Sequence, residues 1–98
     1  MNISAYTVQE TILYYGAKMQ QVVAMEECAE LIKEVSKALR GKFDKEHMAE
    51  EIADVLIVIE NLQQIHHIPD FKIQDYIDKK TERMKERMKN GKGEADRV

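Results

Sequence analysis

The chain has 98 residues, with 15 Lys and Arg against 18 Asp and Glu, a single cysteine and one proline. A chain of this length holds one small domain and cannot build a large hydrophobic core alone. The net charge of −3 argues against a module that binds nucleic acid by neutralising phosphates. One cysteine excludes an intramolecular disulfide framework, and the longest uninterrupted apolar run, 55–59, is too short to span a bilayer. We expect a cytoplasmic protein that does not contact membranes.

Residues that cap or break helices divide the chain into four predicted helices. Thr7 followed by Glu10 predicts a capping box that opens a first short helix, which weakens at Gly16. The second helix then runs to about Arg40. Gly41 supplies the left-handed residue that stops it.

The third and fourth helices follow a short connection. Asp44 is the predicted cap of the third helix, which continues through Gln64 and ends before Pro69, because proline cannot extend it. Asp70 is the predicted cap of the fourth helix. That helix should fade at residues 90–91.

Apolar residues recur at helical spacing and indicate buried faces. They are Met25, Cys28, Ala29, Ile32, Val35 and Leu39 on the second helix, and Met48, Ile52, Val55, Leu56, Ile59 and Leu62 on the third. So much apolar surface in a short chain predicts that a second copy covers part of it. We therefore predict an all-α fold, an antiparallel bundle of three to four helices completed by homo-oligomerisation. Residues 1–90 form a single predicted domain, and 91–98 a loose tail.

Two pairs of acidic residues carry the chemical signal. Glu27 and Glu30 are three residues apart on the second helix, as are Glu51 and Asp54 on the third, so each pair projects in nearly one direction. The short connection makes these helices antiparallel and brings the pairs roughly level. The spacing thus predicts that four carboxylates converge.

Carboxylate oxygens without His or Cys select hard cations, so the expected ion is Mg²⁺, with Mn²⁺ as a possible substitute. Mg²⁺ keeps waters and recruits substrate phosphates, which implies a phosphate-bearing substrate. The alternative is a solvated acidic face, as in a non-catalytic helical regulator that binds a basic partner. Like charges stacked four apart at Glu26, Glu30 and Glu34 argue against it, because each such contact is destabilising.

Two acidic motifs occur in order: EExxE at Glu26 to Glu30, and ExxD within EEIADVLIVIENL. With these motifs the chain resembles the MazG-type all-α nucleoside triphosphate pyrophosphohydrolases, which belong to the MazG-like and dUTPase-like superfamily. The resemblance covers residues 16–88. It implies Mg²⁺-dependent cleavage of a nucleoside triphosphate to monophosphate and pyrophosphate by a homodimer or homotetramer. By motif position it implies a set of metal ligands and two residues that support them. The ligands are Glu27, Glu30, Glu51 and Asp54, and the supporting residues are Glu26 and Glu50.

Within that resemblance, a metal-activated water attacks the α-phosphate, and Glu27 or Glu26 is the candidate proton acceptor. Lys79, Arg83 and Lys33 are candidate phosphate-binding residues, although Arg83 stands where the family places an Asn. Hydrolysis of phosphoribosyl-ATP by the same metal chemistry is an alternative activity. The pattern does not indicate which base is preferred; Gln20 is a weaker candidate for a polar contact near the site.

Overall fold

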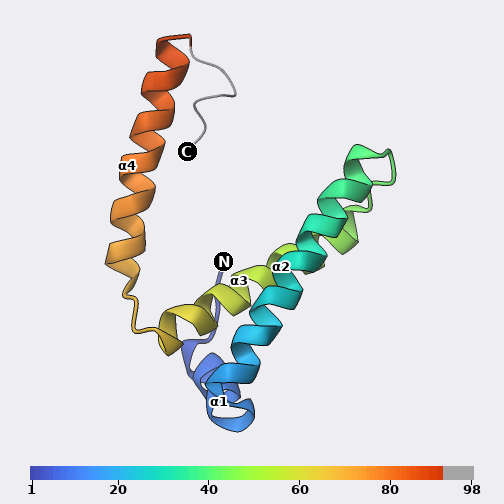
Figure 1. The fold of residues 1–98 in the computed structure, drawn as a ribbon, viewed down its shortest axis with the longest axis vertical. Helices are drawn as coiled ribbons and strands as arrows, with labels where there is room; N and C mark the ends of the chain where they lie inside the picture. Colours follow the sequence, from blue (N-terminus) through green and yellow to red (C-terminus); the bar gives the residue numbers. More distant parts are fainter. Residues whose placement is uncertain (92–98) are drawn as a thin grey trace. The chain divides into compact units, whose positions relative to one another are not determined.

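The computed structural model describes residues 1–91 and contains four α-helices and no strand within them. The helices are α1 (Ala5–Tyr15), α2 (Ala17–Leu39), α3 (Lys45–Ile65) and α4 (Asp70–Lys89), as Figure 1 shows. The predicted all-α class is confirmed. The chain divides into two compact units, Met1–His67 and Ile68–Val98. The single domain over 1–90 stays a prediction, and residues 92–98 of the predicted tail lie outside the described part.

Helix α1 begins before the predicted start. Ser4 is its N-cap, and the Ser4 hydroxyl accepts a hydrogen bond from the backbone N–H of Thr7 at 3.1 Å. The prediction of a cap at Thr7 was therefore wrong, because the extended backbone of Ser4 already places an oxygen over the first turn. Gly16, with φ of 92°, separates α1 from α2 as predicted. Its N–H donates to the carbonyl of Ile12.

The connection between α2 and α3 is built as the sequence predicts. Gly41 has φ of 81°, and the N–H of Lys42 donates to the carbonyl of Lys37 at 2.9 Å, which closes the end of α2. Asp44 then caps α3 by accepting a hydrogen bond from the backbone N–H of His47 at 3.1 Å. This short turn makes α2 and α3 antiparallel neighbours (Figure 1).

Helix α4 differs at its start. Pro69 occupies the capping position and α4 has no side-chain cap, so the prediction that Asp70 caps it was wrong. Asp70 is the first helical residue instead, where its charge suits the helix dipole. The predicted end is confirmed by the Asn90 C-cap and by Gly91, which has φ of 71°. None of the helices described within 1–91 is long and apolar enough to cross a membrane.

The seam between α2 and α3 is polar at regular intervals. Its facing pairs are Gln20 with Asn61, Glu27 with Asp54, and Glu34 with His47. Successive pairs are seven residues apart on both helices, since residues 34, 27 and 20 of α2 face residues 47, 54 and 61 of α3. This is the two-turn repeat of closely packed antiparallel helices. Ala24 and Val58 are buried on the intervening turns.

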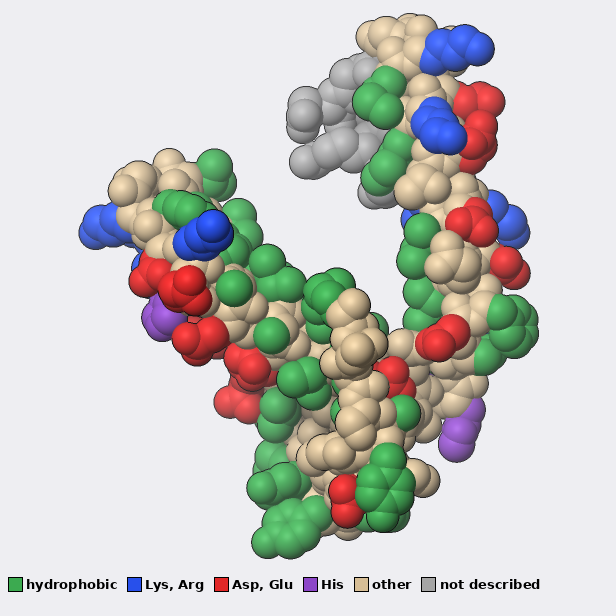
Figure 2. Space-filling model, turned by 180° about the vertical axis from the view of Figure 1, so that it is seen from behind, with side chains coloured by type: hydrophobic (Ala, Val, Ile, Leu, Met, Phe, Trp, Pro, Cys, Tyr) green, Lys and Arg blue, Asp and Glu red, His purple; other side chains and the backbone are tan. Residues whose placement is uncertain are grey.

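The apolar stripe predicted on α2 is not buried within the chain. Met25, Ile32 and Leu39 are 66%, 70% and 85% exposed, and Cys28 is exposed as well. The reason is that α2 presents the polar positions of the seam to α3 and turns the stripe away. Figure 2 shows acidic side chains gathered along the α2–α3 hairpin, with hydrophobic side chains exposed beside them.

Candidate metal centre

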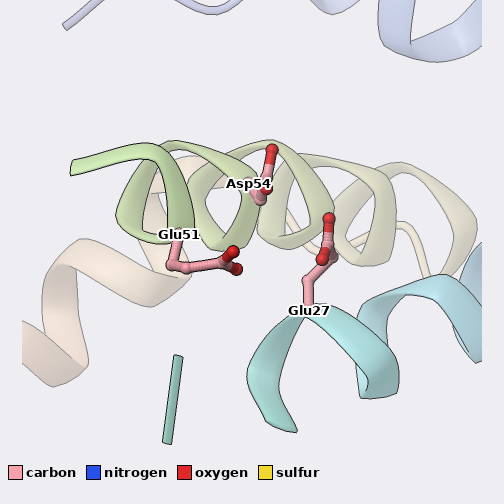
Figure 3. Close-up of side chains that lie close together, drawn as sticks. All are labelled: Glu27, Glu51 and Asp54. Atoms are coloured by element: carbon pink, nitrogen blue, oxygen red, sulfur yellow. The ribbon is translucent and has the colours of Figure 1, made fainter. Parts of the chain in front are cut away.

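Three carboxylates meet in the middle of the α2–α3 seam. Glu27 comes from α2, while Glu51 and Asp54 come from successive turns of α3. Each side chain offers one oxygen such that the three oxygens lie within 4.8 Å of one another (Figure 3). All three residues are half-buried. The close packing of two antiparallel helices therefore concentrates negative charge at one point.

The environment opposes ionisation of two of these groups. Partial burial is the largest cause that raises the pKa of Glu27, followed by the charges of Asp54 and Glu51 and a hydrogen bond with Asp54. Burial also raises the pKa of Glu51, followed by the charges of Asp54 and Glu30. A cation between the carboxylates would remove the repulsion that contributes to both shifts.

Glu51 also has an oxygen without a partner. Its Oε2 atom is buried and forms no hydrogen bond among the described residues. A buried carboxylate oxygen left without a donor or a cation is destabilising. Since the donors are all carboxylates, with no sulfur or imidazole, the residues fit a hard divalent cation such as Mg²⁺.

A comparison with models of protein families identifies the family of the chain. The model of the MazG nucleotide pyrophosphohydrolase domain matches residues 17–91, which includes α2, α3 and α4. The chain belongs to the MazG nucleotide pyrophosphohydrolase family. No curated protein and no solved structure matches it. The resemblance inferred from the acidic motifs is thus confirmed, and membership of this family implies a nucleotide pyrophosphohydrolase.

The other acidic residues of the MazG motif lie apart from the three carboxylates. The side chain of Glu30 is 50% exposed and lies 3.8 Å from the ammonium group of Lys33, outside the group of three. Glu26 and Glu50 are exposed as well. The structure therefore brings together three of the four predicted ligands. The role of Glu30 as the fourth ligand stays a prediction.

The predicted phosphate-binding residues are exposed cations. Lys33 lies on α2 and pairs with Glu30. Lys79 and Arg83 lie on α4, in the second unit of the MazG chain. The ammonium group of Lys79 is 5.8 Å from the centre of the Tyr76 ring. A phosphate-binding role for these three residues stays a prediction.

Two turns from Glu27, toward the α2–α3 connection, the seam holds a paired carboxylate. Glu34 is buried, with one oxygen 3.1 Å from the Lys37 ammonium group and the other 2.8 Å from Nδ1 of His47. The hydrogen bond from Lys37, and then that from His47, lowers the pKa of Glu34. Glu34 is therefore an ionised structural group. Sequence reasoning missed the pairing of Glu34 with Lys37 and His47. The available signal was that Glu34 lies seven residues after Glu27, on the same face of α2.

The opposite side of the metal centre holds a neutral polar pair. Asn61 is 2% exposed and Gln20 is 7% exposed, and the Asn61 amide donates to Oε1 of Gln20 at 2.9 Å. Sequence reasoning named Gln20 as a weak candidate and missed Asn61. The available signal was a polar residue seven positions after Asp54, just beyond the apolar run 55–59.

Proposed function

We propose that this MazG domain hydrolyses a nucleoside or deoxynucleoside triphosphate to the monophosphate and pyrophosphate in a Mg²⁺-dependent reaction. The observation that carries the proposal is the convergence of Glu27, Glu51 and Asp54, with a buried Glu51 oxygen left without a partner. A polyphosphate would be repelled by these carboxylates unless a cation lay between them. Mg²⁺ is bound by both carboxylates and phosphates, so it suits that position.

Glu27, Glu51 and Asp54 would hold the ion, with Glu30 as a further ligand and Mn²⁺ as a possible substitute. When bound, Mg²⁺ neutralises phosphate charge and makes the α-phosphorus more susceptible to attack. The protein contributes the positions of the carboxylates that would hold the ion. Because the ligands project from two packed helices instead of a loop, little side-chain reorganisation is needed when a substrate arrives.

The reaction adds a water oxygen to the α-phosphorus and breaks the bond from that phosphorus to the oxygen bridging the β-phosphorus. The water proton must pass to a base, and Glu27 and Glu26 are the two candidates. Glu27 is half-buried in the seam beside Glu51 and Asp54, whereas Glu26 is exposed, so we propose a carboxylate oxygen of Glu27 as the base. Lys79, Arg83 and Lys33 are proposed to bind the phosphates.

Pyrophosphate release from a panel of nucleoside and deoxynucleoside triphosphates, with phosphoribosyl-ATP included, tests the proposal. We expect release with Mg²⁺ and none after chelation with EDTA. Glu27→Gln and Asp54→Asn should each lower kcat/KM by at least about 100-fold, because removing electrostatic stabilisation of a transition state has effects of this size.

Glu46→Gln is the matched control, because it removes an exposed carboxylate near the start of α3. It should leave turnover unchanged. Absence of Mg²⁺-dependent release from every triphosphate would overturn the proposal and favour a non-catalytic acidic regulator. Release from phosphoribosyl-ATP alone would instead identify the other hydrolase activity.

We also propose that a second copy of the chain covers the exposed stripe of α2, in a homodimer or homotetramer. Three large apolar residues at helical spacing, Met25, Ile32 and Leu39, stay more than half exposed. Contiguous exposed apolar surface of this kind is typical of an interface. Light scattering on the wild-type chain should give a multiple of 11.4 kDa. Ile32→Asp should dissociate the oligomer, and a monomeric wild-type chain would overturn this part.

A further inference from the structure

A cavity of about 360 Å³ opens beside the metal centre. Glu27 and Asp54 form part of its wall, so the cavity and the carboxylates share one space. The volume is near the lower end of the range for small-molecule sites, about 300–1,000 Å³. The cavity is therefore large enough for one planar ring system next to the phosphates that the metal centre would bind.

The walls of this cavity are mostly apolar. The apolar surface comes from Ile3, from Val8 of α1, from Val23 of α2 and from Ile57 and Val58 of α3. Apolar walls favour the face of an aromatic ring over a charged or strongly hydrated group. Walls whose exposed surface is mostly apolar, with polar side chains at particular points, suit a nucleobase better than a phosphate.

The polar groups on the wall form a chain from α1 to α2. The Thr11 hydroxyl lies 2.7 Å from the carbonyl of Val8 and 3.4 Å from Oδ1 of Asn61. A hydroxyl has one proton, and the closer carbonyl of Val8 is its better acceptor. Oδ1 of Asn61 therefore keeps capacity to accept a hydrogen bond from a ligand.

Gln20 complements that acceptor. Its Oε1 atom already accepts from Asn61, so the amide NH₂ of Gln20 is the group left to donate. Gln20, Asn61 and Thr11 all line the cavity. The pair thus offers a donor and an acceptor side by side. Such an arrangement matches the hydrogen-bonding edge of a nucleobase, where donors and acceptors are adjacent.

We propose that this cavity receives the nucleobase of the substrate, and that Gln20 and Asn61 select among bases by hydrogen bonding to the base edge. The inference rests on the proposed triphosphate hydrolysis and adds the group that distinguishes one triphosphate from another. A site built to hydrogen-bond a substrate rejects analogues that lack the matching group, because its polar atoms are then left unpaired.

Gln20→Glu tests the inference with little change in shape. The new carboxylate still accepts the hydrogen bond from Asn61 but presents an acceptor where Gln20 presented a donor. We expect the ratio of kcat/KM between the best and the second-best base to change by at least tenfold. The inhibition constant of Mg²⁺–tripolyphosphate, which has neither base nor sugar, should change less than twofold.

Gln21→Glu is the matched control. It adds the same charge at the next position of α2, where the side chain bonds the Ala17 carbonyl and His66 instead of lining the cavity. It should leave base preference within twofold of wild type. If Gln20→Glu also leaves preference unchanged, or lowers kcat/KM equally for all bases, the inference is overturned.

The wild-type chain gives a second test that does not depend on how a variant folds. Ribose 5-triphosphate, which lacks a base, should be hydrolysed with kcat/KM at least tenfold below that of the best nucleotide. Equal rates, or a wild-type enzyme with no base preference, would overturn the inference while leaving the hydrolase intact. Failure to release pyrophosphate from any triphosphate would instead defeat the proposed function on which the inference rests.

Discussion

Glu27 and Glu34 lie two turns apart on the same face of α2, yet their surroundings shift their pKa values in opposite directions. Glu34 accepts hydrogen bonds from Lys37 and His47, which stabilise its charge. Glu27 faces Asp54 and Glu51 in the half-buried seam. The same residue type therefore has two environments, since the charge of Glu34 is balanced by the protein and that of Glu27 is opposed by its neighbours.

The first prediction concerns metal-free stability. Because Glu27 repels Asp54 and Glu51, Glu27→Gln should raise the melting temperature by a few degrees in EDTA. The same variant should lose most of the stabilisation that Mg²⁺ gives to wild type, which is about 2.7 kcal/mol at an ion concentration 100 times the Kd. Differential scanning fluorimetry with and without Mg²⁺ measures both effects. A variant less stable than wild type in EDTA would contradict the repulsion.

The second prediction is the pH dependence of this effect. A raised folded-state pKa means that the folded chain binds the proton more tightly than the unfolded chain does. The favourable contribution of Glu27 is therefore complete below its ordinary pKa and is lost as pH rises through the raised value. In EDTA, the gain in melting temperature from Glu27→Gln should be largest at pH 7 and should disappear toward pH 4. A pH-independent gain would contradict the assignment.

Glu34 should behave in the opposite way. Its pKa is lowered, so its contribution to stability is present above the ordinary pKa and is lost as pH falls through the lowered value. Glu34→Gln should lower the melting temperature by several degrees at pH 7 and by less near pH 3. Glu46→Gln, at an exposed position, is the control and should change it little. An equal loss at both pH values would show that packing, and not charge, explains the effect.

The helices could be predicted from the sequence because their ends are marked by local chemistry. Gly41 and Asp44 act within one turn of their own positions, and both predictions are confirmed. Ser4 and Asp70 show the limit of that method. Thr7 and Asp70 are good capping residues by type, but the residue that caps depends on where the chain leaves its extended conformation, as it does at Ser4.

The group of three carboxylates was predictable only in part. The three-residue spacing correctly placed Glu51 beside Asp54, and the short turn placed Glu27 opposite them. The contact face of α2 was not predictable from hydropathy. Apolar periodicity pointed to the stripe of Met25 and Ile32, whereas the packed face holds polar residues whose burial depends on partners supplied by α3. Pairing across helices is a tertiary property that one helix does not encode.

A fourth prediction concerns the turn that sets the α2–α3 register. Gly41→Ala would force an L-residue into a left-handed conformation at φ of 81°, although no atom lies within 4 Å of the added methyl group. The expected loss is about 1–2 kcal/mol in the free energy of unfolding. Lys42→Ala, the control beside it, should change the free energy little. Urea denaturation measures both, and equal stability of Gly41→Ala and wild type would show that the turn relaxes without strain.

The fifth prediction separates the ligands by their surroundings. Glu51 has a buried oxygen without a partner, whereas Glu30 is half exposed beside Lys33. Glu51→Gln should therefore weaken Mg²⁺ binding by about 100-fold or more, and Glu30→Gln by about tenfold or less, since loss of supporting groups around a metal typically weakens binding by about 10–100-fold. Isothermal titration calorimetry with MgCl₂ gives both Kd values. If Glu30→Gln weakened binding as much as Glu51→Gln does, Glu30 would have to turn from Lys33 toward the ion. Four carboxylates would then share the ion, as the motif implies.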